Sequence, residues 1–179
     1  MYIVVHPKGG KGVNLFLRYT KGFMDLSKDS ESARHTSSLI QLGATFPFVE
    51  KQFRTLSGRE NRAVSGLSMG GLQTMNFSFD HTEYFDYFGV MSMGITEPRP
   101  DRPNWFENVD ERMKNLQSKG YKLYWIACGT DDFLYEASKN LTARMEGLGL
   151  EYTYRESSGG HTWSNWRIYL SELAPLLFK

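Results

Sequence analysis

Short apolar runs alternate along this chain with longer segments whose apolar residues recur every three or four positions. A continuous run of four to eight apolar residues is typical of a strand covered on both faces, and the longer spacing is typical of a helix. Strands are predicted at residues 2–5, 121–127 and 151–155. Two more are predicted, one that includes residues 63–64 and leads towards Ser68, and one in the later part of residues 84–93. Helices are predicted around 72–79 and at 105–119, 135–148 and 163–178.

Three segments depart from this alternation. Residues 14–36 mix aromatic, charged and small polar side chains without a clean period, so we expect them to be irregular with short helical turns. Residues 37–53 carry a broad apolar face that Gly43 and Pro47 interrupt, which predicts a bent helix. Residues 96–104 contain three prolines and are expected to form a loop.

The alternation of strands and helices predicts an α/β fold with a mainly parallel sheet. Helices should cover both faces of the sheet, with right-handed crossover connections. A chain of 179 residues with 40% hydrophobic content suits a single domain over residues 1–179. In sheets of this kind, functional residues gather beyond the carboxyl ends of the strands.

Composition narrows the classes of partner. The 21 Lys and Arg residues nearly balance the 20 Asp and Glu residues, so we expect neither a nucleic-acid surface nor a basic membrane face. No stretch is long enough for a membrane span, and the apolar run at residues 1–5 is too short for a signal peptide. Cys128 is the only cysteine, which excludes an intramolecular disulfide, and it should lie buried in a strand.

The segment around Ser68 has the pattern of a nucleophile elbow. An apolar strand runs into Gly66-Leu67-Ser68-Met69-Gly70, and a helical pattern follows. In such an elbow the serine adopts a strained backbone conformation at a strand-to-helix turn. Residues larger than glycine at the two flanking positions, here Gly66 and Gly70, would clash. The motif alone is only moderately specific, but its position between a strand and a helix is the context that it requires.

Two further residues complete a candidate site for acyl transfer. Serine needs a base to take its proton and a carboxylate to orient that base. His161 follows the last strand in a glycine-bearing loop, and Asp132 follows the strand before it. The chain order Ser68, Asp132, His161 is that of α/β-hydrolases. Spacing alone leaves Asp131 open as the alternative acid. No ligand cluster with metal spacing occurs, so we expect no metal and no organic cofactor.

The motifs around these residues resemble the esterase D family, especially bacterial feruloyl and acetyl-xylan esterases. The similarity extends from about residue 48 to the C-terminus and rests on three motifs, residues 66–71, 128–132 and 159–163 together with Trp166. The resemblance implies an α/β-hydrolase-type three-layer sandwich. It places the nucleophile on Ser68, the acid on Asp132 and the base on His161. It also implies a secreted or periplasmic enzyme that acts on esters of plant cell-wall polysaccharides.

The N-terminal part departs from the family pattern. Family members carry earlier strands and a His-Gly-rich loop that donates one oxyanion-hole amide, so this chain is expected to be N-terminally truncated. Without those earlier strands the sheet would have a gap, and three arrangements are open. The remaining strands pair directly with one another, a strand of another chain fills the gap in an oligomer, or an N-terminal segment is missing. The Met69 amide is one oxyanion donor, and the glycine-rich residues 6–10 are a candidate for the second.

The resulting hypothesis is a serine carboxylesterase in which Ser68 attacks, His161 shuttles the proton and Asp132 orients His161. Three further side chains suggest an apolar acyl pocket suited to an aromatic acid such as ferulate, although core packing explains them almost as well: Met93, Trp163 and Trp166. Two rivals remain. One is an acyltransferase with the same residues, and the other is an inactive truncated remnant or carbohydrate-binding module.

Overall fold

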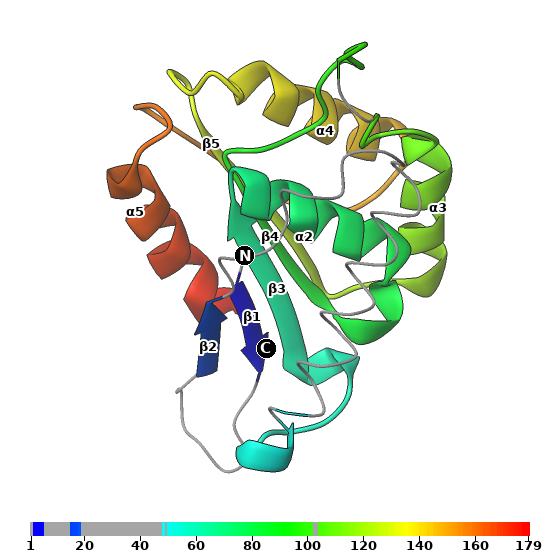
Figure 1. The fold of residues 1–179 in the computed structure, drawn as a ribbon, viewed down its shortest axis with the longest axis vertical. Helices are drawn as coiled ribbons and strands as arrows, with labels where there is room; N and C mark the ends of the chain where they lie inside the picture. The colour runs from blue at the N-terminus through cyan, green and yellow to red at the C-terminus, as the bar shows by residue number, and fades with distance from the viewer. Residues whose placement is uncertain (1, 6–14, 19–47, 49, 102–103) are drawn as a thin grey trace.

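A computed structural model describes residues 2–5, 15–18, 48, 50–101 and 104–179 of the chain. These residues form a six-stranded sheet with the order β2-β1-β3-β4-β5-β6 (Figure 1). The strands are β1 Tyr2–Val5, β2 Leu15–Arg18, β3 Arg62–Leu67, β4 Tyr87–Met91, β5 Leu123–Gly129 and β6 Thr153–Ser157. The α-helices with described bounds are α2 Met69–Asp80, α3 Val109–Lys119, α4 Tyr135–Gly147 and α5 Trp163–Leu173. Short 3₁₀ helices are η1 Arg59–Asn61, η2 Thr82–Tyr84 and η3 Ala174–Leu176.

The four strands from β3 to β6 are parallel, and crossover connections join β3 to β4, β4 to β5 and β5 to β6. This confirms the α/β class and the mainly parallel sheet. β1 runs antiparallel to both of its neighbours, β2 and β3. Ile3 lies opposite Val64 in the β1–β3 pair, so β1 is hydrogen-bonded directly to the strand that leads into Ser68.

The expectation for residues 14–36 was wrong at one place. Leu15–Arg18 forms β2, which pairs with β1 so that Leu15 lies opposite Val5. A run of four residues has too little periodicity of its own, and pairing with a neighbouring strand decides its conformation. The rest of 14–36 and most of the helix expected at 37–53 lie outside the described residues, although 48 and 50–52 are helical.

Helix boundaries differ from the expected ones at two places. The C-terminal helix stops at Leu173 rather than near Phe178, because Pro175 lies in the following turn and cannot donate a helical hydrogen bond. The helix expected from Trp105 begins only at Val109, after Asn108 in a left-handed conformation with φ 51°.

Side chains of the central strands alternate between the two faces of the sheet and feed two apolar cores. The larger core lies under α2, α3 and α4, and the smaller lies under α5 (Figure 1). Phe88, Val90 and Ile126 belong to the larger core, whereas Met91 and Ala127, one residue further along their strands, belong to the smaller. Helices therefore cover both faces. No helix in the described ranges is both long and apolar enough to cross a membrane.

Candidate active site

Ser68 occupies the sharp turn between β3 and α2. Its backbone has φ 52° and ψ −123°, outside the conformations that a serine adopts without strain. The Ser68 amide donates a 2.9 Å hydrogen bond to the carbonyl of Met91 at the end of β4. The turn is therefore fastened to the neighbouring strand, and the serine lies at the carboxyl edge of the parallel sheet.

Glycine is needed beside Ser68 because the chain nearly meets itself there. A Cβ at Gly66 would lie 2.1 Å from the carbonyl oxygen of Gly70, which belongs to the backbone and cannot turn aside as a flexible side chain could. A Cβ at Gly71 would lie 2.7 Å from the Cβ of Met93. The close approach explains why glycine stands at positions 66 and 71, and it supports the interpretation of this turn as a nucleophile elbow.

The first turn of α2 offers amide hydrogens beside Ser68. The amides of Gly71 and Leu72 donate to the Ser68 carbonyl, at 2.8 and 3.1 Å. Within the described part of the chain, the amides of Met69 and Gly70 have no acceptor, as is usual for the first residues of a helix. A helix N-terminus with unpaired N–H groups favours negative charge. This property suits the predicted role of the Met69 amide as a donor to the oxyanion.

Asp132 and His161 form a direct contact after strands β5 and β6. Nδ1 of His161 lies 3.0 Å from both carboxylate oxygens of Asp132. The Asp132 side chain is fully buried, and its Oδ1 accepts a 2.9 Å hydrogen bond from the amide of Leu134. Asp131 is exposed and its carboxylate instead accepts the amide of Gly159 at 3.2 Å. Asp132 is thus the carboxylate that contacts the imidazole.

Two aromatic rings contact the imidazole of His161. The Phe133 ring is tilted against it with a centroid distance of 4.6 Å, and the Trp166 indole meets it edge-on at 4.9 Å. Trp166 is buried and donates from Nε1 to Oγ of Ser92 at 2.9 Å. Trp163 is half exposed and packs against Trp166 with ring centroids 5.2 Å apart. These contacts restrict the orientation of the imidazole from more than one side.

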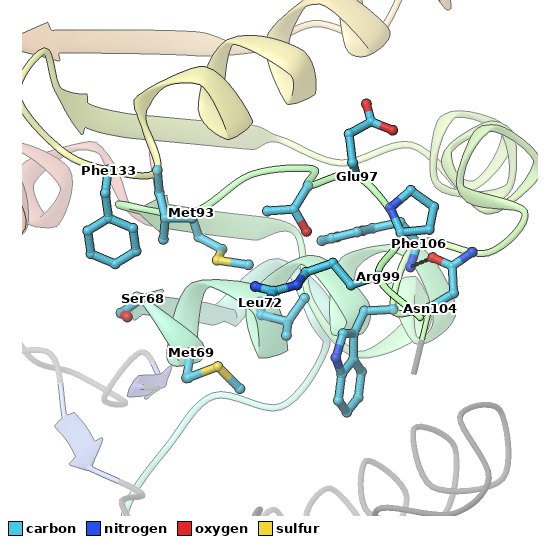
Figure 2. Close-up of a pocket in the computed structure, with 13 residues that line it drawn as sticks. Ser68, Met69, Leu72, Met93, Glu97, Arg99, Asn104, Phe106 and Phe133 are labelled. Carbon is cyan, nitrogen blue, oxygen red and sulfur yellow. Dashed lines mark hydrogen bonds between the residues drawn. The ribbon is translucent and has the colours of Figure 1, made fainter. Parts of the chain in front are cut away.

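The structure brings Ser68 and His161 to the same edge of the sheet without a hydrogen bond between them. Phe133 connects the two: its ring contacts His161, and it lines the same pocket as Ser68 (Figure 2). Contacts between a nucleophile and its base are often long in the absence of substrate and shorten in the complex. The arrangement can therefore supply a hydroxyl, an imidazole and a carboxylate to one reacting centre.

A pocket of about 390 Å³ opens beside Ser68. Figure 2 shows the Arg99 side chain reaching across it above Leu72, while the carboxylate of Glu97 points away. Its lining consists of Ser68, Met69, Leu72, Met93, Thr96, Glu97, Pro98, Arg99, Asn104, Trp105, Phe106, Phe133 and Leu134. The lining is mainly apolar, and Arg99 is its one cationic side chain.

Of the three residues expected in the acyl pocket, Met93 lines it. Trp163 and Trp166 are absent from the lining and pack beside the imidazole instead. Sequence reasoning missed Arg99 and Phe133. Phe133 had a signal, because it directly follows the predicted acid, whereas Arg99 depends on the path of a proline-rich loop.

Cys128 lies behind Asp132, at the end of β5. Burial raises the pKa of its thiol to about 12, and the negative charge of Asp132 adds to the effect. The thiol is therefore uncharged and poorly nucleophilic at neutral pH. Among the described residues, no group of three or more His, Cys, Asp or Glu side chains could hold a metal ion.

Comparison with known proteins shows the family of the chain. A family model described as "Putative esterase" matches residues 1–177. The chain belongs to this esterase family. The sequence is also 30% identical over 141 residues to an endo-1,4-beta-xylanase/feruloyl esterase of Xylanibacter ruminicola, an alignment that covers 78% of this chain and 17% of that protein.

Two more esterases are similar. An acetyl esterase of Caldicellulosiruptor saccharolyticus is 26% identical over 160 residues, covering 74% of this chain and 60% of that protein. A solved structure of a ferulic acid esterase superposes with a TM-score of 0.67 at 26% identity, covering 78% of this chain and 59% of the other. The chain thus spans less than two thirds of the length of these relatives. The shared fold and the family model agree with the resemblance inferred from the motifs, but the family match begins at residue 1 rather than near residue 48 as expected.

Proposed function

We propose that this chain is a serine carboxylesterase that hydrolyses carbohydrate-linked esters, with feruloyl or acetyl groups on xylan as the substrate class. The family and the names of its relatives support ester hydrolysis. The observation that carries the proposal is the contact between the buried Asp132 and His161, beside an elbow that presents Ser68.

The proposed reaction proceeds through an acyl-enzyme. The Ser68 hydroxyl attacks the ester carbonyl while Nε2 of His161 takes its proton, and the alcohol leaves with that proton. Water then attacks the acyl-enzyme by the same route in reverse. Asp132 accepts the hydrogen bond from Nδ1 of His161, which fixes the tautomer with Nε2 free and stabilises the imidazolium. Closure of the Ser68–His161 contact accompanies substrate binding.

The negative oxygen of the tetrahedral intermediate would lie at the start of α2. The Met69 amide is the proposed donor, since it has no partner among the described residues and the helix dipole favours an anion there. The candidate for a second donor, residues 6–10, lies outside the described residues. With a single donor, turnover should be lower by a factor of about 10² to 10³ than with two.

The pocket favours an aromatic acyl group over acetate. A volume of about 390 Å³ falls in the range of pockets that enclose drug-sized ligands, whereas an acetyl group would leave most of it filled with water. Leu72, Met93 and Phe106 offer apolar walls for an aryl ring. We therefore propose feruloyl esters as the better substrates.

A substrate panel tests this function. Methyl ferulate and methyl acetate, which share one leaving group, are offered to the wild type and to Ser68→Ala, and product release is followed by chromatography. We expect a higher kcat/KM for methyl ferulate and no turnover above background in Ser68→Ala. Preference for acetate would contradict the aromatic pocket, and equal turnover by Ser68→Ala would contradict the serine mechanism. Addition of xylo-oligosaccharide to the same reactions shows whether a sugar hydroxyl competes with water, as an acyltransferase would require.

A further inference from the structure

Ser92, directly after β4, has an unusual combination of burial and backbone conformation. It is 0% exposed and has φ 48°, in the left-handed region that favours glycine. Its amide donates a 2.8 Å hydrogen bond to the carbonyl of Ala127 on β5, so the conformation is held by the sheet. A strained serine in a position that glycine could occupy suggests that the side chain has a role.

The hydroxyl of Ser92 is the acceptor for the indole of Trp166. The 2.9 Å hydrogen bond is buried and joins the end of β4 to the first turn of α5. A buried indole N–H needs an acceptor, and this one fixes the rotation of the whole ring. The fixed ring then meets the imidazole of His161 edge-on, with centroids 4.9 Å apart and an interplanar angle of 88°.

We propose that Ser92 is a positioning residue that sets the orientation of His161 through Trp166. The inference rests on the proposed role of His161 as the base. Asp132 holds one nitrogen of the imidazole, which still leaves the ring free to swing about that hydrogen bond. Contact with the fixed indole on one side, together with the Phe133 ring on another, removes this freedom and holds Nε2 in one direction.

The end of β4 therefore supports both reacting groups. The carbonyl of Met91 accepts the Ser68 amide at 2.9 Å, and the next residue, Ser92, holds Trp166 against His161. Two successive residues at the buried end of β4 thus position the proposed reacting groups: Met91 holds the nucleophile, and Ser92 orients the base. Misplacement of reacting groups by about 1 Å costs about 10²-fold in rate, so this support should matter for turnover.

Ser92→Gly is the sharpest variant, because it deletes the hydroxyl and leaves a residue that adopts φ 48° without strain. The fold should be retained, since the backbone hydrogen bond to Ala127 does not need a side chain. We expect kcat to fall by about tenfold or more while KM changes by less than about threefold, because substrate contacts are unaltered.

A double-mutant cycle tests whether Ser92 acts through Trp166. Trp166→Phe keeps an aromatic ring and removes the donor to Ser92. If the two residues act as one unit, Ser92→Gly combined with Trp166→Phe should lose no more activity than the worse single variant. Multiplied losses, or a Ser92→Gly kcat within twofold of the wild type, would overturn the proposal.

Ser78→Ala is the matched control. It also deletes a serine hydroxyl with 0% exposure, whose 3.1 Å hydrogen bond to Tyr124 lies in the larger core rather than at the site. We expect this variant to lower the unfolding temperature and to leave kcat unchanged. A loss of kcat in Ser78→Ala equal to that of Ser92→Gly would mean that any buried defect impairs turnover, and it would overturn the specific role of Ser92.

A readout without turnover separates this proposal from the proposed function. Carbon-13 relaxation of the His161 imidazole is measured in the wild type and in Ser92→Gly. Greater ring motion in the variant supports the positioning role, and identical motion overturns it. If the wild type lacks turnover that depends on Ser68, the esterase proposal fails, and the relaxation result still decides the role of Ser92.

Discussion

Both carboxylate oxygens of Asp132 lie 3.0 Å from Nδ1 of His161, and the carboxylate has no exposed surface. In the proposed mechanism, a buried carboxylate in this geometry holds the Nδ1–H tautomer and stabilises the imidazolium. Leu134 provides a second hydrogen bond to Oδ1, so the carboxylate itself is fixed. The pair is therefore preorganised before any substrate binds.

Asp132→Asn should lower kcat by about 10⁴-fold while the fold is retained. The amide can donate to Nδ1, which favours the tautomer with the proton on Nε2, and that nitrogen can then no longer accept the proton of Ser68. Steady-state hydrolysis of methyl ferulate measures the loss.

Asp131→Asn is the control for this variant, because its exposed carboxylate contacts the Gly159 amide and not the imidazole. We expect kcat within about threefold of the wild type, as for a surface substitution. A larger loss in Asp131→Asn than in Asp132→Asn would reverse the assignment of the acid.

Gly66→Ala should disrupt the elbow. The added Cβ would lie 2.1 Å from the Gly70 carbonyl oxygen, so the backbone around Ser68 must move. We expect a destabilisation of about 3 kcal/mol or more in urea unfolding, together with loss of turnover.

Gly147→Ala provides the comparison, because a Cβ there meets nothing within 4 Å at the end of α4. It should be neutral or stabilising by up to about 1 kcal/mol, through the higher helix propensity of alanine. Equal unfolding free energies for the two variants would refute the steric account of the elbow.

Arg99 should contribute to the choice of acyl group. Its side chain crosses the pocket above Leu72, where it can donate to the oxygen substituents of a feruloyl ring (Figure 2). Arg99→Gln should raise KM for methyl ferulate about fivefold, the equivalent of one net hydrogen bond of about 1 kcal/mol. KM for methyl cinnamate, which lacks these oxygens, should not change.

Arg167→Gln, an exposed substitution on α5, controls for the loss of a positive charge. An equal rise in KM for both esters in Arg99→Gln would show that the side chain acts on pocket shape rather than through hydrogen bonds.

Cys128 should make stability depend on alkaline pH. Its pKa is raised to about 12 in the folded protein, so the folded state holds this proton more tightly than the unfolded state. The resulting stabilisation is fully present below the ordinary thiol pKa and is lost as pH rises from about 9 towards 12. Urea unfolding between pH 8 and pH 11 should show a steeper loss in the wild type than in Cys128→Ala, by at most about 1.4 kcal/mol per pH unit. Parallel curves for the two proteins would contradict the raised pKa.

The sequence predicted the parts of this structure that have local signatures. Ser68, Asp132 and His161 could be predicted as site candidates because each follows a predicted strand in a glycine-bearing turn, and parallel strands bring such turns to one edge. β2 was missed because its conformation depends on its pairing with β1 rather than on its own pattern. Arg99 could not be assigned to the pocket from the sequence, because its position depends on the path of a loop. The spacing of apolar residues predicts helices and strands but not the path of a loop.

Covalent trapping can show whether Ser68 is the nucleophile. The protein is incubated with a fluorophosphonate, and intact mass and peptide mass spectra are recorded for the wild type and for Ser68→Ala. We predict one adduct per wild-type chain, on the peptide that contains Ser68, and no adduct on Ser68→Ala. A folded wild-type protein that gains no adduct, or an adduct that persists in Ser68→Ala, would show that Ser68 is not the nucleophile.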